Sequence, residues 1–352
     1  MKTWFTIAGI LIIAGSLIFT LSACNGGLNF DKNLEEKTVN VTDSFEGVDI
    51  CTSTANISIL PSDDGSTKVV SKDIKKIKYT ANIENGILKI KAEDTRKWFE
   101  RISFVNSSAL TVYLPLGEYT SLSIDESTGN IAISEGYKFG NVDIKLSTGN
   151  INLKNIICAD FSLKLSTGDT CINGITCKSF TSTGSTGDIT VNNITATGNT
   201  SIKRSTGNIN INTANLGGNL STETDTGNNN AKNVTCLGNF ELEVSTGRSE
   251  LSNITCANFS SEGDTGNLIM NNVIATGKFS IERDTGDVKF NGCDAAEIYV
   301  ETDTGNVTGT LLSDKIFQTN TDTGSVNVPE SWSGGKCKIE TDTGNIKISI
   351  QQ

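Results

Sequence analysis

Apolar and polar residues alternate along most of this chain, and a Thr-Gly pair interrupts the alternation at regular intervals. A period of two is typical of strands that bury one face. Apolar residues stand seven and five positions before the pair's glycine, as in Phe279 and Ile281, and two and four positions after it, as in Ile209 and Ile211. Inward-facing segments on both sides of a recurring turn predict a chain that winds around a core.

The turns have a fixed period. The glycine of each Ser-Thr-Gly or Asp-Thr-Gly tripeptide lies 19 or 20 residues after the previous one. The turn glycines are Gly129, Gly149, Gly168, Gly187, Gly207, Gly227, Gly247, Gly266, Gly286, Gly305, Gly324 and Gly344. Such a period indicates a repeat architecture, and Thr-Gly pairs with many β-branched residues argue against helical repeats. The sequence therefore predicts an all-β fold, a single-stranded parallel β-solenoid (β-helix) of about 12 regular coils of 19–20 residues.

A second corner is expected six residues after each turn glycine. Residues that tolerate the left-handed backbone region recur there. They are Asn155, Gly174, Asn193, Asn233, Asn253, Asn272 and Gly292. A third short apolar segment follows, so each coil should have three faces. Coils stacked about 4.8 Å apart would form a rod of roughly 55 to 60 Å.

The repeat begins well after the amino terminus and defines four regions. We interpret residues 1–24 as a signal peptide or transmembrane anchor, 25–44 as a linker, 45–120 as irregular N-terminal β-coils that cap the core, and 121–352 as the regular solenoid. Ser53-Thr54-Ala55-Asn56 resembles a decayed corner with Ala55 in place of glycine. At the far end, residues 346–350 still alternate, and no cap is evident.

The amino-terminal region predicts the cellular compartment. Trp4 to Ala23 is uncharged and long enough to span a bilayer as one hydrophobic helix, with Lys2 before it. The positive-inside rule then places the rest of the chain on the extracytoplasmic face of the cell membrane. Leu21-Ser22-Ala23-Cys24 matches a bacterial lipobox, which would make Cys24 a lipidation site. Lipoprotein and uncleaved anchor both stay open, and either tethers the protein to the membrane.

Composition excludes one class of partner. The chain has 40 acidic and 29 basic residues, a net charge of -11 and no histidine. Nucleic-acid binding requires a concentrated basic surface, so we expect no nucleic-acid partner. With 34 glycines, 3 prolines and 6% aromatic residues, the chain has the composition of one elongated array.

Four of the nine cysteines share one phase. Cys158, Cys177, Cys236 and Cys256 each lie nine residues after a turn glycine, where other coils carry alanine or leucine. This pattern favours small buried core thiols over disulfides, although neighbouring coils could bring two thiols within bridging distance. The absence of histidine removes the usual partners of a zinc site.

The Asp-Thr-Gly tripeptides admit two structural interpretations. The tripeptide also occurs in aspartic proteases, but here its flanks are polar and serine replaces the aspartate in half the corners, which indicates turn chemistry. Aspartates aligned in five successive coils could instead bind calcium, with nearby Asn267, Asp287, Asn306 and Asn345 as further oxygen ligands. This candidate metal row is Asp264, Asp284, Asp303, Asp322 and Asp342. The alternative is a row of Asx turns satisfied by backbone amides, with no cofactor.

An outward position changes its charge along the chain. Four residues before the turn glycine stand Lys145, Lys164 and Lys203, and then Glu223, Glu243, Glu262, Glu282 and Glu301. The row is either a solvated face or a ligand surface whose sign changes along the rod.

The phrases Ser-Thr-Gly-Asn-Ile and Asp-Thr-Gly-Asp-Val, and the segment 279–290, carry a family resemblance. Residues 45 to 352 resemble the bacterial putative-adhesin β-strand-repeat family, a domain of unknown function. The resemblance implies a β-solenoid on the cell envelope, often behind one transmembrane segment. It supplies no catalytic residues.

Two function classes follow. The first is a non-catalytic adhesin-like binding module or envelope scaffold, with an envelope protein or glycan as ligand. The alternative is a cell-surface β-helix carbohydrate-active enzyme of the lyase or hydrolase type, with Arg204, Arg248 or Arg283 as its basic residue. We expect no enzymatic activity, because the repeat shows no inserted loop or off-phase acid pair.

Overall fold

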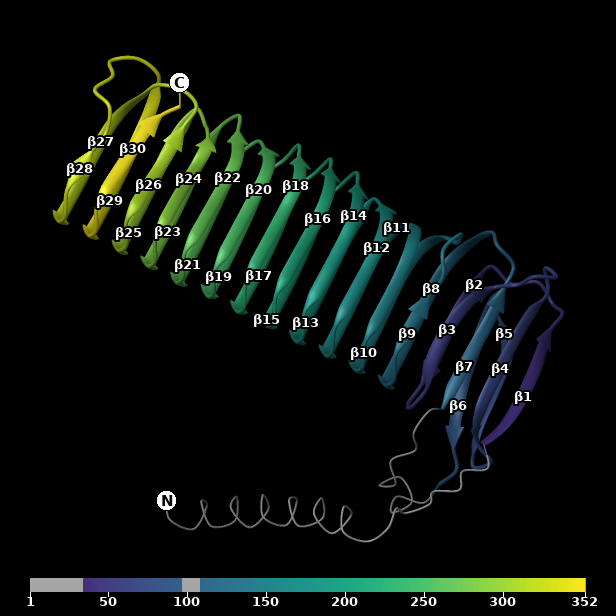
Figure 1. The fold of residues 1–352 in the computed structure, drawn as a ribbon. Coiled ribbons are helices and arrows are strands. Elements are labelled where there is room, and N and C mark those ends of the chain that lie inside the picture. The colour runs from purple at the N-terminus through teal and green to yellow at the C-terminus, as the bar shows by residue number, and fades with distance from the viewer. Residues whose placement is uncertain (1–33, 97–107, 352) are drawn as a thin grey trace, which may run out of the picture.

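The computed structural model describes residues 34–96 and 108–351, which form a parallel β-solenoid of thirty strands and contain no helix (Figure 1). The hydrophobic helix predicted within residues 1–24, and with it Cys24, lies outside the described residues. None of the described segments could serve as a membrane-crossing helix. The predicted all-β solenoid of about twelve coils is confirmed.

The N-terminal strands are β1 (Leu34–Val41), β2 (Gly47–Thr52), β3 (Asn56–Pro61), β4 (Thr67–Ile74), β5 (Ile77–Glu84), β6 (Ile87–Asp94), β7 (Ala109–Leu114), β8 (Glu118–Thr128), β9 (Ile131–Ile133) and β10 (Lys138–Thr148). The central strands are β11 (Ile151–Thr167), β12 (Thr170–Cys177), β13 (Ser179–Thr186), β14 (Ile189–Ala196), β15 (Thr200–Thr206), β16 (Ile209–Leu216), β17 (Leu220–Thr226), β18 (Asn229–Cys236), β19 (Phe240–Thr246), β20 (Ser249–Cys256) and β21 (Phe259–Thr265). The distal strands are β22 (Leu268–Ala275), β23 (Lys278–Thr285), β24 (Val288–Cys293), β25 (Glu297–Thr304), β26 (Val307–Leu311), β27 (Lys315–Thr323), β28 (Val326–Asn327), β29 (Gly335–Thr343) and β30 (Ile346–Ile350).

Each regular coil contributes one strand to each of two parallel ladders. From β13 to β25 the odd-numbered strands pair with one another and form ladder 1. The even-numbered strands form ladder 2. Strand β11 is long enough to contribute to both ladders, because its first half pairs with β12 and its second half with β13. Partners in neighbouring coils are 19 or 20 residues apart, so equivalent side chains stack along the rod.

The Thr-Gly corner requires glycine for two reasons. Gly207 has φ +136°, a region that L side chains rarely adopt. A Cβ at this position would lie 2.2 Å from the carbonyl oxygen of Gly187 in the preceding coil. The stacked backbones thus leave no space for a side chain at this corner.

The second corner bends β11 and the even-numbered strands from β12 to β24. Asn155, Asn193, Asn233, Asn253 and Asn272 have φ between 45° and 60°, as their phase in the repeat predicted. Thr213 occupies the same position in another coil, with φ 68°. A β-branched residue is strained in this region, so Thr213 is a local exception to the repeat.

Rows of side-chain amides and carboxylates connect the coils at the corners. The residue after the turn glycine accepts a hydrogen bond from the backbone N–H of its counterpart in the next coil. Donor–acceptor distances are 2.7–3.0 Å. We call this the Asx row; its acceptors are Asn56, Asn130, Asn150, Asp169, Asp188, Asn208, Asn228, Asn267, Asp287, Asn306 and Asn345. Each such bond contributes about 0.5–1.5 kcal/mol, so the row reinforces the stack.

The core lies between the two ladders and consists of stacked apolar side chains. Phe161 and Phe180 stack with ring centroids 5.0 Å apart, while Phe240, Phe259 and Phe279 meet edge to face at 5.5 and 5.9 Å. All five rings are buried. Aromatic pairs contribute about 0.5–1.5 kcal/mol beyond their buried area.

At the N-terminal end, the order of the coils in space differs from their order in the chain. Strands β2 and β3 lie between the coil of β6 and β7 and the coil of β8 and β9. The corner of this inserted coil is Ala55, which is fully buried, and Asn56 begins the Asx row. Ser53-Thr54-Ala55-Asn56 is therefore a true corner of the solenoid.

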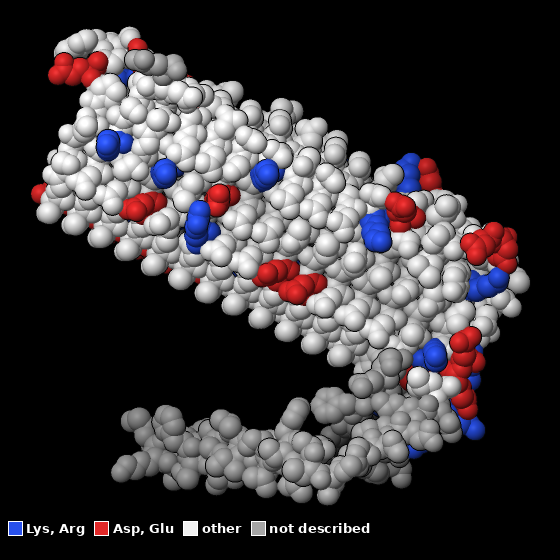
Figure 2. Space-filling model, viewed as in Figure 1, with Lys and Arg blue, Asp and Glu red and all other residues white. Residues whose placement is uncertain are grey.

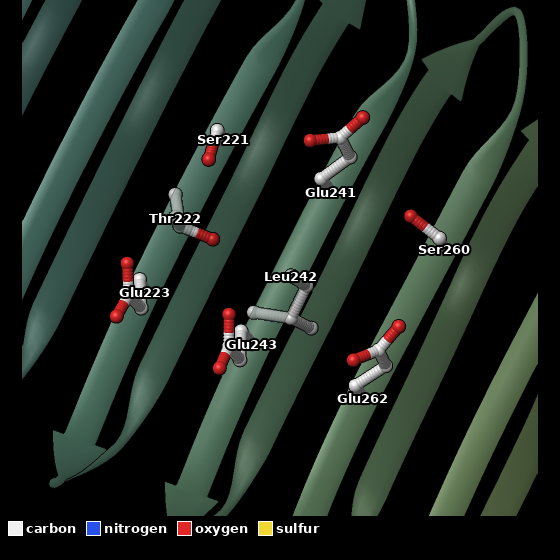
Figure 3. Close-up of a pocket in the computed structure, with 8 residues that line it drawn as sticks. All are labelled: Ser221, Thr222, Glu223, Glu241, Leu242, Glu243, Ser260 and Glu262. Atoms are coloured by element: carbon white, nitrogen blue, oxygen red, sulfur yellow. The ribbon is translucent and has the colours of Figure 1, made fainter.

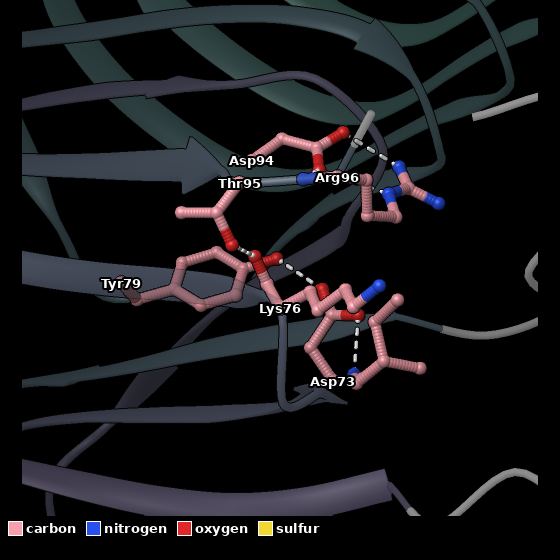
Figure 4. Close-up of polar contacts among 7 residues, drawn as sticks. Asp73, Lys76, Tyr79, Asp94, Thr95 and Arg96 are labelled. Atoms are coloured by element: carbon pink, nitrogen blue, oxygen red, sulfur yellow. Dashed lines mark hydrogen bonds and ion pairs between the residues drawn. The ribbon is translucent and has the colours of Figure 1, made fainter. Parts of the chain in front are cut away.

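Antiparallel strands close this end of the rod. Strand β5 pairs with β6, while β4 pairs with both β1 and β7. Polar contacts fix their connections (Figure 4): Tyr79 donates a hydrogen bond to Asp73 at 2.9 Å, and Thr95 donates one to the carbonyl of Lys76 at 2.7 Å. Arg96 and Asp94 form an ion pair at 2.8 Å.

The distal end has a second exchange of order, which the repeat period does not predict. Strands β29 and β30 stack directly on β25 and β26, whereas β27 and β28 form the outermost coil (Figure 1). The expectation that coils follow the chain to its end was therefore wrong here. Gly334 and Gly335 permit the insertion: a Cβ would lie 1.8 Å from the Asp314 carbonyl oxygen at the first and 1.7 Å from that of Ala296 at the second.

Candidate binding surface

Six glutamates form a continuous row on the outer side of ladder 1. They lie in register on six neighbouring strands, from β17 to β25 and then β29. We call this the Glu row: Glu223, Glu243, Glu262, Glu282, Glu301 and Glu340. Adjacent strands are about 4.8 Å apart, so each inner carboxylate has a like charge on both sides. Glu340 belongs to the row only because of the distal exchange of coils.

The row passes through a shallow groove of about 270 Å³ (Figure 3). Glu241 lies in this groove between Ser221 and Ser260 of the neighbouring strands. The two serines are small, so they leave the sides of Glu241 open. Glu223, Glu243 and Glu262 lie next to one another along the same groove.

The electrostatics of Glu243 show the effect of this crowding. Partial burial, followed by the like charges of Glu223 and Glu262, raises the pKa of Glu243 above its ordinary 4.5. A neighbouring cation would offset that repulsion. The surface is thus suited to a positively charged ligand.

The Glu row begins where a lysine row ends. Lys145 and Lys164 are in register, and Thr183 lies between Lys164 and Lys203 in this row. Lys203 pairs in register with Glu223, to which it also forms an ion pair. The predicted change of sign along one exposed face is therefore present in the structure. The face that Figure 2 shows carries only scattered charges.

The aspartates of the Asp-Thr-Gly corners run beside the Glu row. Asp264, Asp284, Asp303, Asp322 and Asp342 are all exposed. Because of the distal exchange, Asp342 follows Asp303 along the rod and Asp322 is outermost, so the expected sequence of coils was wrong at this point.

The calcium hypothesis for these aspartates stays a prediction. Among residues 34–96 and 108–351, no three acidic, cysteine or histidine side chains converge in an arrangement that could hold a metal ion. The proposed additional ligands Asn267, Asp287 and Asn306 accept backbone hydrogen bonds in the Asx row. Those hydrogen bonds are made at the residue after the glycine, so they do not test the Asx-turn alternative for the five aspartates themselves.

The arginines considered for an enzyme do not form a surface site. Arg204 and Arg283 point into the core and are 1% and 4% exposed. Arg283 therefore points away from the surface on which the next residue, Asp284, is exposed. Arg248 is on the surface and forms an ion pair with Glu250 at 2.8 Å.

Each buried arginine occupies space left by a glycine in the preceding coil. Gly184 stacks on Arg204, and Gly263 stacks on Arg283. Each guanidinium donates to a buried serine two residues before that glycine, Ser182 at 3.2 Å and Ser261 at 2.5 Å. Burial lowers the pKa of both arginines to about 10. The sequence signal for this arrangement, which the predictions above did not use, is a Ser-x-Gly segment one coil before an arginine at an inward-facing position.

The phased cysteines lie in the core. Cys158, Cys177, Cys236 and Cys256 are buried free thiols. Burial raises the pKa of Cys158, Cys177 and Cys256 to about 12. The thiolate is the nucleophilic form, so these side chains act as small apolar core residues.

The sequence model of the Toastrack DUF4097 family matches residues 45–246 and 233–352. The chain belongs to this family, as the resemblance of its repeats predicted. No curated protein matches the chain.

Three solved structures are similar to the chain. A putative adhesin from Bacteroides fragilis NCTC 9343 is 15% identical, with 91% of this chain and 98% of that chain covered and a TM-score of 0.37. A putative adhesin from Parabacteroides merdae ATCC 43184 is 13% identical over 80% and 97%, with a TM-score of 0.37. A putative lipid binding protein from Parabacteroides distasonis ATCC 8503 is 14% identical over 90% and 98%, with a TM-score of 0.32.

Proposed function

We propose that this protein is a non-catalytic, membrane-tethered binding module of the extracytoplasmic face, whose Glu row binds an extended, positively charged partner. The observation that carries the proposal is the in-register alignment of six glutamates on one exposed face. Repeat proteins commonly bind ligands along such continuous faces. A basic peptide segment of an envelope protein has the matching chemistry, because its cations can lie between successive carboxylates.

Two further features support a binding role over catalysis. From Glu223 to Glu301 the Glu row continues at one residue per coil without an inserted loop. Arg283, which precedes the corner aspartate Asp284, faces the core. The membrane tether is supported by the uncharged run before the solenoid. Fractionation of cells that produce the full chain, with carbonate extraction and protease accessibility, tests the tether and its orientation.

Binding is tested by titrating the full chain in detergent with fluorescent oligolysine of about ten residues. We expect Kd to rise steeply with salt concentration, because the contact is between exposed charges. The triple variant Glu243→Gln, Glu262→Gln, Glu282→Gln should weaken binding by at least tenfold.

A matched variant controls for net charge. Glu36, Asp43 and Asp63 are exposed and lie outside the Glu row. The variant Glu36→Gln, Asp43→Asn, Asp63→Asn changes the net charge by the same amount and should bind like the wild type. Equal weakening in both variants would indicate nonspecific attraction and contradict the proposal.

A further inference from the structure

The outermost coil leaves core positions uncovered. Val326 is in register with Ile346, which in turn is in register with Val307. Ile346 and Val307 are fully buried, whereas Val326 is 44% exposed. Within residues 34–96 and 108–351, β27 pairs only with β29, and β28 only with β30. The distal tip therefore presents one unpaired strand edge from each ladder and the open end of the core.

The side chains of this tip are unlike those that protect an edge from association. Proteins usually place charges on exposed edge strands, and terminal repeats usually carry a polar outer surface. On the outermost strand, Asn320 lies in register with Glu340 at the end of the Glu row, and Gln318 lies in register with Lys338. Ile316 is 43% exposed, and Trp332, in the loop between β28 and β29, is 95% exposed. The charge that recurs along the rod is absent from the middle of the last strand.

The edge strand is compatible with its own copy. If β27 paired antiparallel with β27 of a second molecule about a two-fold axis at Thr319, Phe317 would lie opposite Thr321 and Gln318 opposite Asn320. Phe317 and Thr321 are both half-buried inward positions, while Gln318 and Asn320 are both exposed. No like charges would be opposed, and each side chain would stay on its own face of the sheet.

We propose that two copies of this chain associate tip to tip through β27 and β28 and form a continuous rod of twice the length. Among the described residues, the other end of each rod is closed by the antiparallel strands β1 and β5, whose edges differ from the parallel edges of the tip. The contact is therefore isologous and closes as a dimer. The exposed Val326 and the half-buried Phe317 become covered, as their counterparts are in the interior.

Substitutions at the two-fold axis test this interface. The full chain is purified in detergent, the mass of its protein component is measured by light scattering, and particle length is measured by negative-stain electron microscopy. We expect wild-type particles to contain two chains of 37.4 kDa each and to be twice as long as a single rod. Thr319→Lys places two like charges on the axis and should raise the dimer dissociation constant at least tenfold, whereas Thr319→Val should not weaken the dimer.

Two further variants keep the test decisive. Val326→Lys acts on the other ladder and should also give single rods, so the result does not depend on the folding of one variant. Leu237→Lys changes a residue that is 73% exposed in the turn between β18 and β19, and it should leave the dimer intact. A wild type that remains a single rod at about 50 µM, a dimer that Thr319→Lys and Val326→Lys do not weaken, or particles of double width would overturn the proposal.

Discussion

Gly184 and Arg204 occupy the same inward position in neighbouring coils, and a Cβ on Gly184 would lie 2.8 Å from Nη1 of Arg204. Arg204 is 1% exposed, and its guanidinium donates hydrogen bonds to the Lys203 carbonyl at 2.9 Å and to Ser182 at 3.2 Å. Neither acceptor is a carboxylate, so the charge is buried without a directly bonded counterion. The glycine and the arginine thus form one structural unit across two coils.

This relationship predicts strong coupling in a double-mutant cycle. Gly184→Ala should destabilise the protein by about 2 kcal/mol, because its methyl group overlaps the arginine side chain. Arg204→Met should be close to neutral, since replacing a buried charge by an apolar side chain of similar length removes its desolvation cost. In the Arg204→Met background, adding Gly184→Ala should lower the free energy of unfolding by much less. Urea unfolding measures the coupling free energy, and strictly additive effects would contradict the proposed coupling between the two residues.

The sequence was sufficient for the regular coils, because a fixed period constrains all of them at once. The positions of the turn glycines, the asparagine corner and the inward phenylalanines are all set by the phase of one repeat. The same period could not reveal the distal exchange, because Gly324 and Gly344 keep the normal spacing whichever coil is outermost. The loop before β29, with Pro329 and the Gly334-Gly335 pair, is the local departure from the repeat that accompanies the distal exchange of coils. The Glu row was predicted up to Glu301, and Glu340 was missed for this reason.

Thr213 provides a test of corner strain. Its φ of 68° is unfavourable for a β-branched residue, and its counterparts in the adjacent coils are Asn193 and Asn233. Thr213→Asn should raise the free energy of unfolding by about 1 kcal/mol, because asparagine tolerates this region. Thr235→Asn is the control: Thr235 is also exposed but lies in β18 outside the left-handed region, where threonine favours the strand. Chemical denaturation would contradict the strain argument if both substitutions had the same effect.

Gly335 tests how the distal exchange is accommodated. A Cβ there would lie 1.7 Å from a backbone oxygen of Ala296, which no side-chain rotation can relieve. Gly335→Ala should therefore destabilise the inserted coil by about 2 kcal/mol or more. Because repeats interact mainly with their neighbours, hydrogen exchange should accelerate in β27 to β30 and stay unchanged in β13 to β21. Gly117→Ala is the control, since no atom lies within 4 Å of the added Cβ. Unchanged exchange in the distal strands of Gly335→Ala would refute this account.

Glu243 predicts a pH dependence that is specific to the Glu row. Partial burial and the charges of Glu223 and Glu262 raise its pKa in the folded protein above the ordinary 4.5. At a pH between the ordinary pKa of 4.5 and the raised pKa, Glu243 binds a proton more readily in the folded protein than in the unfolded chain. The stability that the protonated group contributes is therefore complete below about pH 4.5 and is lost as the pH rises through the raised pKa. Glu243→Gln removes this loss, so its thermal midpoint should equal that of the wild type near pH 4 and exceed it at pH 7. The difference should shrink in about 0.5 M salt, because salt screens the neighbouring carboxylates.

Glu241→Gln is the matched control, since serines flank it on the adjacent strands, and it should show no comparable gain. If both variants gained equally at pH 7, repulsion within the Glu row would not be the cause.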